Sequence, residues 1–202
     1  MIDPIESFCR THGLPFDAQA AERFTTYLEL LEKLNVGMNL IGPLSREAII
    51  DELLIDSLTP AVACAPTGKI LDVGTGAGLP GIPLKILYPD LPITFVEPRR
   101  KRATFLKICT KRLGLDDVTI HEARIEDVPH DEYQYVISKA FQPPLNWIET
   151  ASKWLATDGV LVCMTRQTEK EGLLNRAREL DLEPKGEHEN ERAIYVFAPI
   201  RR

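Results

Sequence analysis

The chain has 202 residues, of which 44% are hydrophobic and 27% are charged, and its formal net charge is −6. This length suits one domain with a substantial core, and the composition excludes wholesale disorder. No apolar run approaches the roughly 20 residues of a transmembrane helix, and the amino terminus lacks the pattern of a secretory signal. We therefore expect a cytoplasmic monomer that does not contact a membrane.

The four cysteines and four histidines are scattered along the chain, and no two cysteines form a Cys-x-x-Cys pair. Zinc sites and disulfide frameworks depend on close, regular spacing of such residues. We therefore expect no metal site, and cysteines that serve as small apolar residues in a reducing compartment. The acidic balance, taken alone, argues against a nucleic-acid partner, because such partners usually meet a basic domain.

The first part of the chain, residues 1–65, is predicted to be a helical extension. Asp17 is a candidate N-cap for a helix that runs to about Leu34, and Ser45 is a candidate N-cap for a second helix. The segment 35–43 between them contains two glycines and a proline and is predicted to be a loop. The sequence leaves two roles open for these helices: they cover one side of a sheet, or they also contact a substrate.

The second part, residues 66–202, alternates short β-rich runs with stretches long enough for helices. The predicted strands are 69–73, 93–96, 118–121, 135–138, 160–164 and 193–197, and the predicted helices are 80–87, 99–113, 145–155 and 169–180. Such alternation is typical of a parallel sheet covered on both faces. A short polar link joins runs 184–187 and 193–197, which predicts a terminal antiparallel hairpin. The predicted fold is therefore α/β.

A glycine-rich loop follows the first predicted strand and opens a helix. Its spacing is Gly-x-Gly-x-Gly (Gly74, Gly76, Gly78), and Asp72 precedes it. A dinucleotide fingerprint instead spaces its third glycine one residue further on and directs a helix N-terminus at a pyrophosphate. S-adenosylmethionine has no phosphate, and its ammonium suits Asp72. We expect Asp72, Gly74, Thr75, Gly76 and Gly78 to surround this cofactor, with NAD or a ligand-free turn as less favoured alternatives.

Two more features follow the next strands. Glu97 ends the second predicted strand, about 20 residues after the loop, where a carboxylate can accept hydrogen bonds from both ribose hydroxyls. Ile125 and Glu126 follow the third strand, and the carboxyl ends of parallel strands meet at one sheet edge. An adenine could stack on Ile125 and bond to the backbone or Glu126 there, whereas a solvated acidic loop is the simpler alternative.

A run of basic residues occupies segment 99–112, which contains seven of the 24 basic residues and no acidic one. On a helix such residues form an exposed face that can follow RNA phosphates, although a charge run is often only a solvated surface. The acidic total therefore does not exclude an enzyme that meets RNA through one basic helix. The candidate RNA-binding residues are Arg100, Lys101, Arg102, Lys107 and Lys111.

Several motifs together resemble the RsmG (GidB) family of bacterial methyltransferases that modify 16S ribosomal RNA. The glycine loop, continued through Leu79-Pro80-Gly81-Ile82-Pro83-Leu84, carries two prolines that are uncommon in methyltransferases generally. The order and spacing of further motifs also fit: Asn39-Leu40, Asp56-Ser57-Leu58, Lys101-Arg102-x-x-Phe105-Leu106, Leu113-Gly114-Leu115, Ser138-Lys139-Ala140-Phe141 and Glu191-Arg192. The resemblance covers essentially the whole chain.

The resemblance implies a class I, Rossmann-like methyltransferase fold and transfer of a methyl group from S-adenosylmethionine to N7 of a guanine in 16S rRNA, near the decoding site. The implied substrate is 16S rRNA or the small ribosomal subunit. It also implies cofactor contacts at Gly74, Leu79, Ile125, Glu126 and Lys139. Lys139 stands where the family usually has arginine, and it keeps the positive charge but loses the planar fork.

Guanine N7 has a free lone pair and needs no general base, which fits a chain without an evident catalytic His, Cys or Asp pair. Lys139 is then the candidate catalytic residue, holding a phosphate, guanine O6 or the cofactor, and a solvated lysine at a strand end is the alternative. Phe141 and Trp147 are candidate stacking platforms or core residues. Two other functions stay open: methylation of another RNA site or small molecule, and cofactor binding without turnover.

Overall fold

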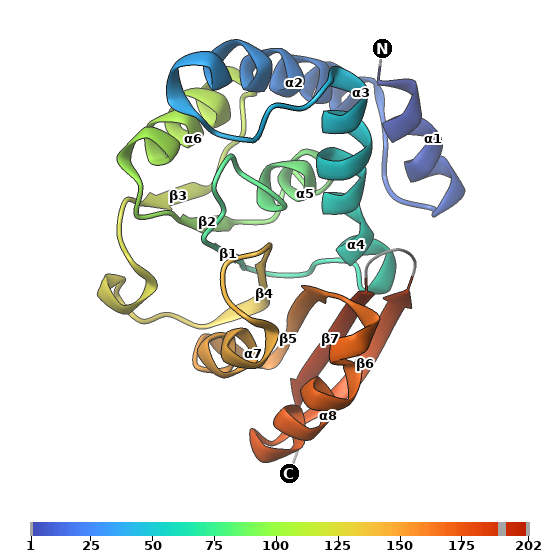
Figure 1. Ribbon diagram of the computed structural model, residues 1–202, viewed down its shortest axis with the longest axis vertical. Coiled ribbons are helices and arrows are strands. Elements are labelled where there is room, and N and C mark those ends of the chain that lie inside the picture. Colours follow the sequence, from blue (N-terminus) through green and yellow to red (C-terminus); the bar gives the residue numbers. More distant parts are fainter. Residues whose placement is uncertain (1, 190–192, 201–202) are drawn as a thin grey trace.

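A seven-stranded sheet organises the computed structural model, which describes residues 2–189 and 193–200 (Figure 1). The strand order is β3-β2-β1-β4-β5-β7-β6. Strands β1 to β5 pair in parallel, and β7 runs antiparallel to both β5 and β6. The strands are β1 Ile70–Val73, β2 Ile93–Val96, β3 Val118–His121, β4 Tyr133–Ser138, β5 Leu155–Thr165, β6 Leu182–Glu189 and β7 Ala193–Pro199. The predicted mostly parallel sheet with an antiparallel end is confirmed.

Helices cover both faces of this sheet, and successive strand residues enter two separate cores. Ile70 joins the core shared with α5 (Gly81–Leu87) and α6 (Arg100–Arg112), whereas its neighbour Leu71 joins the core under α7 (Pro144–Ser152) and α8 (Lys170–Glu179). This alternation follows from the pleat, because consecutive side chains of a strand point to opposite faces. Every residue of β1 is buried, as a central parallel strand requires.

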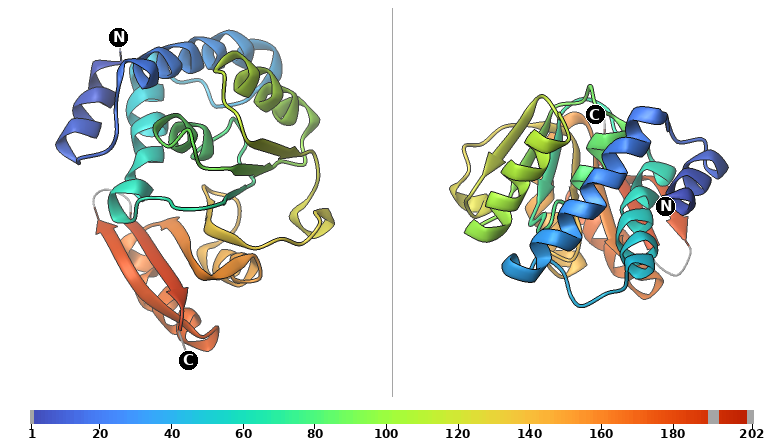
Figure 2. Two further views of the ribbon diagram at one scale, coloured as in Figure 1. Left: turned by 180° about the vertical axis from the view of Figure 1, so that it is seen from behind. Right: turned by 90° about the horizontal axis from the view of Figure 1, so that it is seen from above.

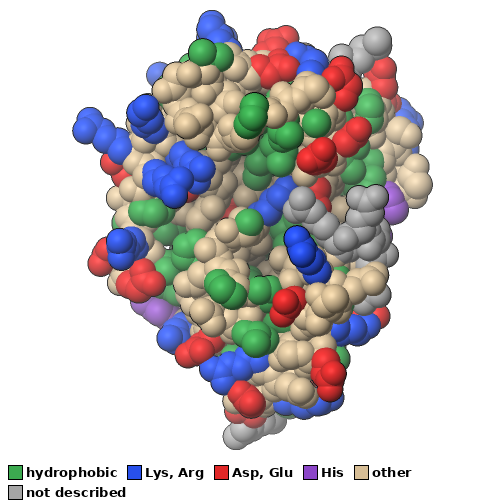
Figure 3. Space-filling model, viewed as in Figure 1, with side chains coloured by type: hydrophobic (Ala, Val, Ile, Leu, Met, Phe, Trp, Pro, Cys, Tyr) green, Lys and Arg blue, Asp and Glu red, His purple; other side chains and the backbone are tan. Residues whose placement is uncertain are grey.

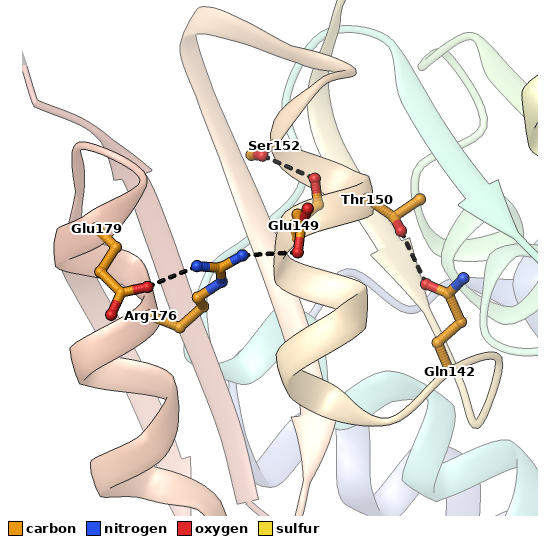
Figure 4. A network of polar contacts seen from close by, with 6 residues as sticks. All are labelled: Gln142, Glu149, Thr150, Ser152, Arg176 and Glu179. Atoms are coloured by element: carbon orange, nitrogen blue, oxygen red, sulfur yellow. Dashed lines mark hydrogen bonds and ion pairs between the residues drawn. The ribbon is translucent and has the colours of Figure 1, made fainter.

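Polar contacts join the two helices of the second core at the surface (Figure 4). Arg176 of α8 contacts Glu149 of α7 at 2.6 Å and Glu179 of its own helix at 2.5 Å. Both contacts are solvent-exposed, so they contribute little to the stability of the fold. Thr150 of α7 donates to Gln142 in the segment before the helix, which ties that segment to α7.

The amino-terminal helices lie on the α5 and α6 side of the sheet. They are α1 (Asp3–Thr11), α2 (Ala18–Met38), α3 (Arg46–Ala48), the π-helix η1 (Ile49–Ile55), the 3-10 helix η2 (Asp56–Leu58) and α4 (Thr59–Ala63). Helix α2 packs against α5 and α6 (Figure 2). Their apolar residues share one core with Ile70 of the sheet, so this part of the chain covers one sheet face.

The predicted caps are present, but two helix boundaries differ from the predictions. Asp17 accepts a hydrogen bond from the Ala20 amide at 2.7 Å, and Ser45 accepts one from the Ala48 amide at 3.2 Å. Helix α2 continues beyond Leu34, because Asn39 ends it in the left-handed conformation and Asn35 accepts bonds from the Leu40 and Ile41 amides. The helix capped by Ser45 changes to π and 3-10 geometry, which periodicity alone did not predict.

The remaining boundaries shift by a few residues. Strand β5 begins at Leu155, earlier than predicted, and α7 ends at Ser152, so the predicted helix end falls in the strand. Strand β6 extends the predicted run in both directions. Two short 3-10 helices, η3 (Ile125–Asp127) and η4 (Gln167–Glu169), follow β3 and β5. The Glu191-Arg192 motif and part of the predicted hairpin link lie outside the described residues.

Candidate functional site

The glycine loop after β1 is held in place by the carboxylate of Asp72. Its Oδ2 accepts a hydrogen bond from the Thr75 hydroxyl at 2.6 Å and one from the Gly81 amide at 2.8 Å. Asp72 is fully buried, and its Oδ1 has no hydrogen-bond partner. Burial raises the pKa of Asp72 to about 7, against the opposing effect of the Thr75 and Gly81 hydrogen bonds. This carboxyl therefore closes the loop and leaves one oxygen for a proton or a further donor.

Glu97, at the end of β2, joins the glycine loop to the start of α6. Its Oε2 accepts from the Gly76 amide and its Oε1 from the Arg99 amide, both at 2.9 Å. The side chain is 2% exposed. A carboxylate oxygen has two lone pairs, so each keeps capacity for one more donor. Glu97 thus fixes the neighbouring backbone and still presents acceptors at the sheet edge.

Tyr27 of α2 supports the same loop from the amino-terminal part of the chain. Its hydroxyl donates to the Ala77 carbonyl at 2.8 Å, and the ring is fully buried. Helical periodicity in the sequence gives no signal for this polar contact. The amino-terminal helices therefore reach the site and do more than cover the sheet.

Phe141 lies directly against Gly74. A β-carbon placed on Gly74 would lie 2.5 Å from the Phe141 ring, and Gly74 has a φ of +67°. Only glycine meets both requirements without strain or displacement. Phe141 also meets Trp147 edge to face, with centroids 6.1 Å apart. Trp147 is a core residue, 3% exposed, whose indole donates to the Val162 carbonyl, so it is not a stacking platform.

A cavity of about 230 Å³ opens at the carboxyl ends of β1 and β2. Three of the predicted cofactor residues line it, namely Gly74, Ile125 and Glu126. Asp72, Thr75, Gly76, Gly78 and Glu97 belong to the loop and its supports, whereas Leu79 is 8% exposed and packs in the core. The sequence did not single out the other wall residues: Val73, Val96, Pro98 and Arg124.

Comparison with known proteins identifies the relatives of this chain. The family model described as "GidB: rRNA small subunit methyltransferase G" matches residues 20–191. The chain belongs to the GidB family. It is 34% identical over 174 residues to a ribosomal RNA small subunit methyltransferase G of Methylobacillus flagellatus, covering 86% of this chain and 84% of that one. The predicted family is confirmed, and the chain is therefore a methyltransferase.

Solved structures share the fold of this GidB chain. A ribosomal protein L11 methylase from Lactobacillus delbrueckii subsp. bulgaricus has a TM-score of 0.61 at 12% identity, over 74% of this chain and 79% of that one. TYW2 from M. jannaschii in complex with AdoMet has a TM-score of 0.59 at 15% identity, over 73% and 75%. The predicted class I methyltransferase fold is confirmed, and the NAD-binding alternative is set aside.

The side chains at the GidB glycine loop fit S-adenosylmethionine. The cavity walls from Val73, Val96, Ile125 and Phe141 are apolar, as an adenine ring requires. The buried, unpartnered Oδ1 of Asp72 is an acceptor that lacks a donor, and the ligand's ammonium is a donor. Glu97 keeps acceptor capacity for ribose hydroxyls. Neither Asp72 nor Glu97 is among the residues that line the cavity, so their roles toward the cofactor stay predictions.

The predicted basic helix exists as α6, and it borders the glycine loop. The inner face of α6 is apolar and buried, with Phe105, Leu106 and Cys109. On its outer face, Arg102 is half-buried and four basic residues are exposed: Arg100, Lys101, Lys107 and Lys111. Figure 3 shows Lys and Arg side chains gathered on the left of the view, over α6.

Two of these cations already have partners within the protein. Lys107 lies 3.6 Å from Glu122, and Lys101 donates to the Gly37 carbonyl at 3.3 Å. The Arg102 guanidinium reaches over Gly76, 3.5 Å from where a β-carbon would stand. The basic face of α6 therefore starts beside the glycine loop and extends along the helix away from that loop.

Lys139 is mostly buried and forms an ion pair. Its Nζ lies 2.6 Å from Asp56 Oδ2 and 3.4 Å from the Leu53 carbonyl, and the two charged side chains are 10% and 11% exposed. The solvated-lysine alternative is therefore wrong. The pair joins the end of β4 to the Asp-Ser-Leu motif of the amino-terminal part. Ala140 next to it has a φ of +55°, which turns the chain toward Phe141.

A second cavity of about 600 Å³ lies beside the first, at the ends of β4 and β5. Lys139 lines this second cavity and not the first. Its other wall residues are Ala140, Gln142, Pro144, Met164, Thr165, Arg166 and Glu169. The sequence offered one signal for these wall residues, namely their position after β4 and β5, because ligands of open α/β sheets bind at the carboxyl ends of strands.

The described residues, 2–189 and 193–200, hold neither a metal centre nor a membrane span. Within those ranges no group of three or more His, Cys, Asp and Glu side chains could hold a metal ion. No helix in the described part of the chain is long and apolar enough to cross a membrane.

Proposed function

We propose that this GidB protein transfers a methyl group from S-adenosylmethionine to N7 of a guanine in 16S rRNA, as a monomer in the cytoplasm. The observation that carries the proposal is a cavity at the carboxyl ends of β1 and β2, lined by Gly74, Ile125 and Glu126, that lies beside a second, larger cavity. Family membership over residues 20–191 supports the reaction. The four free cysteines support a reducing compartment.

The chain's own residues bind and orient rather than move protons. When bound, the cofactor supplies an electrophilic methyl carbon: the N7 lone pair forms the new N–C bond while the S–C bond breaks and its electron pair stays on sulfur. The base gains one positive charge and the sulfonium loses one, so no proton transfer is needed. Holding nucleophile, carbon and sulfur in line is a positioning task, which can lower a barrier by several kcal/mol.

In this proposal Asp72 and Glu97 hold the ammonium and the ribose, and Ile125, Glu126 and Phe141 enclose the adenine. Thr75, Gly76, Gly78 and Leu79 shape the loop around them.

The exposed face of α6 follows the RNA backbone, with Arg100, Lys101, Arg102, Lys107 and Lys111 as the phosphate-binding residues. The ion pair between Lys139 and Asp56 holds the segment 138–141 in place, so the role of Lys139 is to position Phe141 and the cavity wall.

The test is a deletion strain whose 16S rRNA is analysed for 7-methylguanosine by mass spectrometry. We expect one site to lose the modification and plasmid-borne protein to restore it. Full methylation in the deletion strain would refute the proposal. Purified protein, labelled cofactor and either naked rRNA or small subunits from that strain then identify the substrate form. Cofactor binding without transfer to any RNA would favour the non-catalytic alternative instead.

A further inference from the structure

The second cavity carries a polar pattern that complements one nucleobase. Its lining includes one carboxylate, Glu169, one side-chain amide, Gln142, and two cations, Lys139 and Arg166. A volume of about 600 Å³ lies within the range of small-molecule sites and accommodates a nucleotide. Lys139 and Ala140 face this cavity while the next residue, Phe141, faces the cofactor cavity. A base in the second cavity would therefore lie next to the bound methyl donor.

The side-chain amide of Gln142 forms a hydrogen bond with Thr150. Its Oε1 accepts from the Thr150 hydroxyl at 2.9 Å, so its NH₂ group is left as a donor (Figure 4). Glu169 is half-buried at the end of η4 and offers only acceptors. The cavity thus presents donor hydrogens from one wall residue and a carboxylate from another.

Guanine matches this pattern through its Watson–Crick edge. That edge presents O6 as an acceptor and N1–H and N2–H₂ as adjacent donors, which suit an amide NH₂ and a carboxylate respectively. Adenine presents the reverse at the same positions, a donor at N6 and an acceptor at N1, and it has no group at C2. Binding by this edge leaves N7, on the neighbouring Hoogsteen edge of the purine, free to face the cofactor cavity.

We propose that the second cavity is the pocket for the target guanine and that Glu169 determines base specificity by accepting hydrogen bonds from N1–H and N2–H₂. The proposal rests on the proposed function and names how its substrate base is recognised. Gln142 donates to O6, and Arg166 binds the phosphate of the same nucleotide. Arg166 is exposed, as a group that meets incoming RNA must be.

The carboxylate also favours the reaction itself. Methylation at N7 leaves the purine positively charged, so N1–H and N2–H₂ become stronger donors as the new bond forms. The interaction with Glu169 is therefore stronger in the transition state than in the ground state, and such interactions raise the rate. The ion pair between Lys139 and Asp56 also favours the reaction. The Asp56 carboxylate offsets the positive charge of Lys139, which would otherwise repel a base that becomes cationic.

The test compares two RNA substrates and two variants. Small subunits are reconstituted with 16S rRNA that carries guanosine or inosine at the methylated position, inosine lacking only the 2-amino group. The protein carries Glu169→Gln, with Glu171→Gln as a matched control on the exposed side of α8. Cofactor affinity, measured by calorimetry on each variant, verifies the fold. Methyl transfer is followed as kcat/KM.

For the unaltered protein we expect inosine to lower kcat/KM about 10- to 100-fold. Glu169→Gln should lower it on guanosine by a similar factor and leave the two substrates within about threefold of each other, because the discriminating contact is gone. Glu171→Gln should behave as the unaltered protein. Equal losses on both substrates, or none on guanosine, would overturn the role of Glu169. No transfer to guanosine by the unaltered protein would overturn the proposed function, and this inference with it.

Discussion

Replacing Gly74 by alanine tests whether the glycine loop and Phe141 are fitted to each other. Gly74 and Gly76 have almost the same backbone conformation, with φ of +67° and +60°. An alanine there costs about 1–2 kcal/mol at either position. Their surroundings differ: the new β-carbon would lie 2.5 Å from the Phe141 ring at position 74, but 3.5 Å from the Arg102 guanidinium at position 76. Gly76→Ala is therefore a matched control for backbone strain.

The clash adds to the strain only at Gly74. Displacing a packed ring costs about 1–3 kcal/mol, so Gly74→Ala should lower the free energy of unfolding by about 2–5 kcal/mol and Gly76→Ala by about 1–2 kcal/mol. Urea denaturation measures both. Because Gly74 and Phe141 line the first cavity and Gly76 does not, Gly74→Ala should weaken cofactor binding more than Gly76→Ala does in calorimetry.

A double-mutant cycle with Phe141→Ala separates the ring from other effects. Removing the ring should recover about 1 kcal/mol or more of the loss caused by Gly74→Ala, because the clash disappears. If Gly74→Ala cost no more than Gly76→Ala, or if the two changes were additive, the inferred fit between Gly74 and Phe141 would be wrong.

Three further predictions concern the supports of the site. The pKa of Asp72 is about 7 in the folded protein and about 3.9 in the unfolded chain. Between these two values the folded state therefore keeps a proton on Asp72 that the unfolded state has lost. The free energy of unfolding should therefore fall as pH rises from about 4 to 7, by up to about 1.4 kcal/mol per pH unit, and Asp72→Asn should flatten this slope in urea titrations. Tyr27→Phe should cost about 1–3 kcal/mol, because the buried Ala77 carbonyl loses its donor; an unchanged urea midpoint would contradict this. Lys139→Ala should reduce cofactor affinity and methyl transfer together, and Asp56→Ala should do the same, because the pair acts by positioning the segment 138–141; loss of transfer with intact affinity in calorimetry would instead indicate that Lys139 contacts the RNA.

Local patterns in the sequence determined the fold class and the position of the cofactor site. Buried runs such as Ile70–Val73 carry apolar side chains on both faces, with Asp72 as the exception, and they alternate with helical segments, so a parallel sheet was predictable. Asp17 and Ser45 cap their helices because capping depends only on residues three positions away. The glycine spacing and Glu97 predicted a cofactor site at the carboxyl ends of β1 and β2, where the structure has a cavity, since strand ends in a parallel sheet lie together.

Tertiary structure alone decided how distant residues meet. The ion pair of Lys139 with Asp56, the Tyr27 contact with Ala77 and the approach of Phe141 to Gly74 join segments far apart in sequence, and no local periodicity encodes such pairs. The second cavity likewise combines residues that follow β4 with residues that follow β5. The sequence by itself therefore determined which groups are predicted to surround the cofactor. Packing of the amino-terminal helices against the sheet decided that Lys139 is paired with Asp56. The parallel pairing of β4 with β5 decided that Glu169, Gln142 and Arg166 share a cavity, because the sides of such a cavity exist only once the strands are aligned.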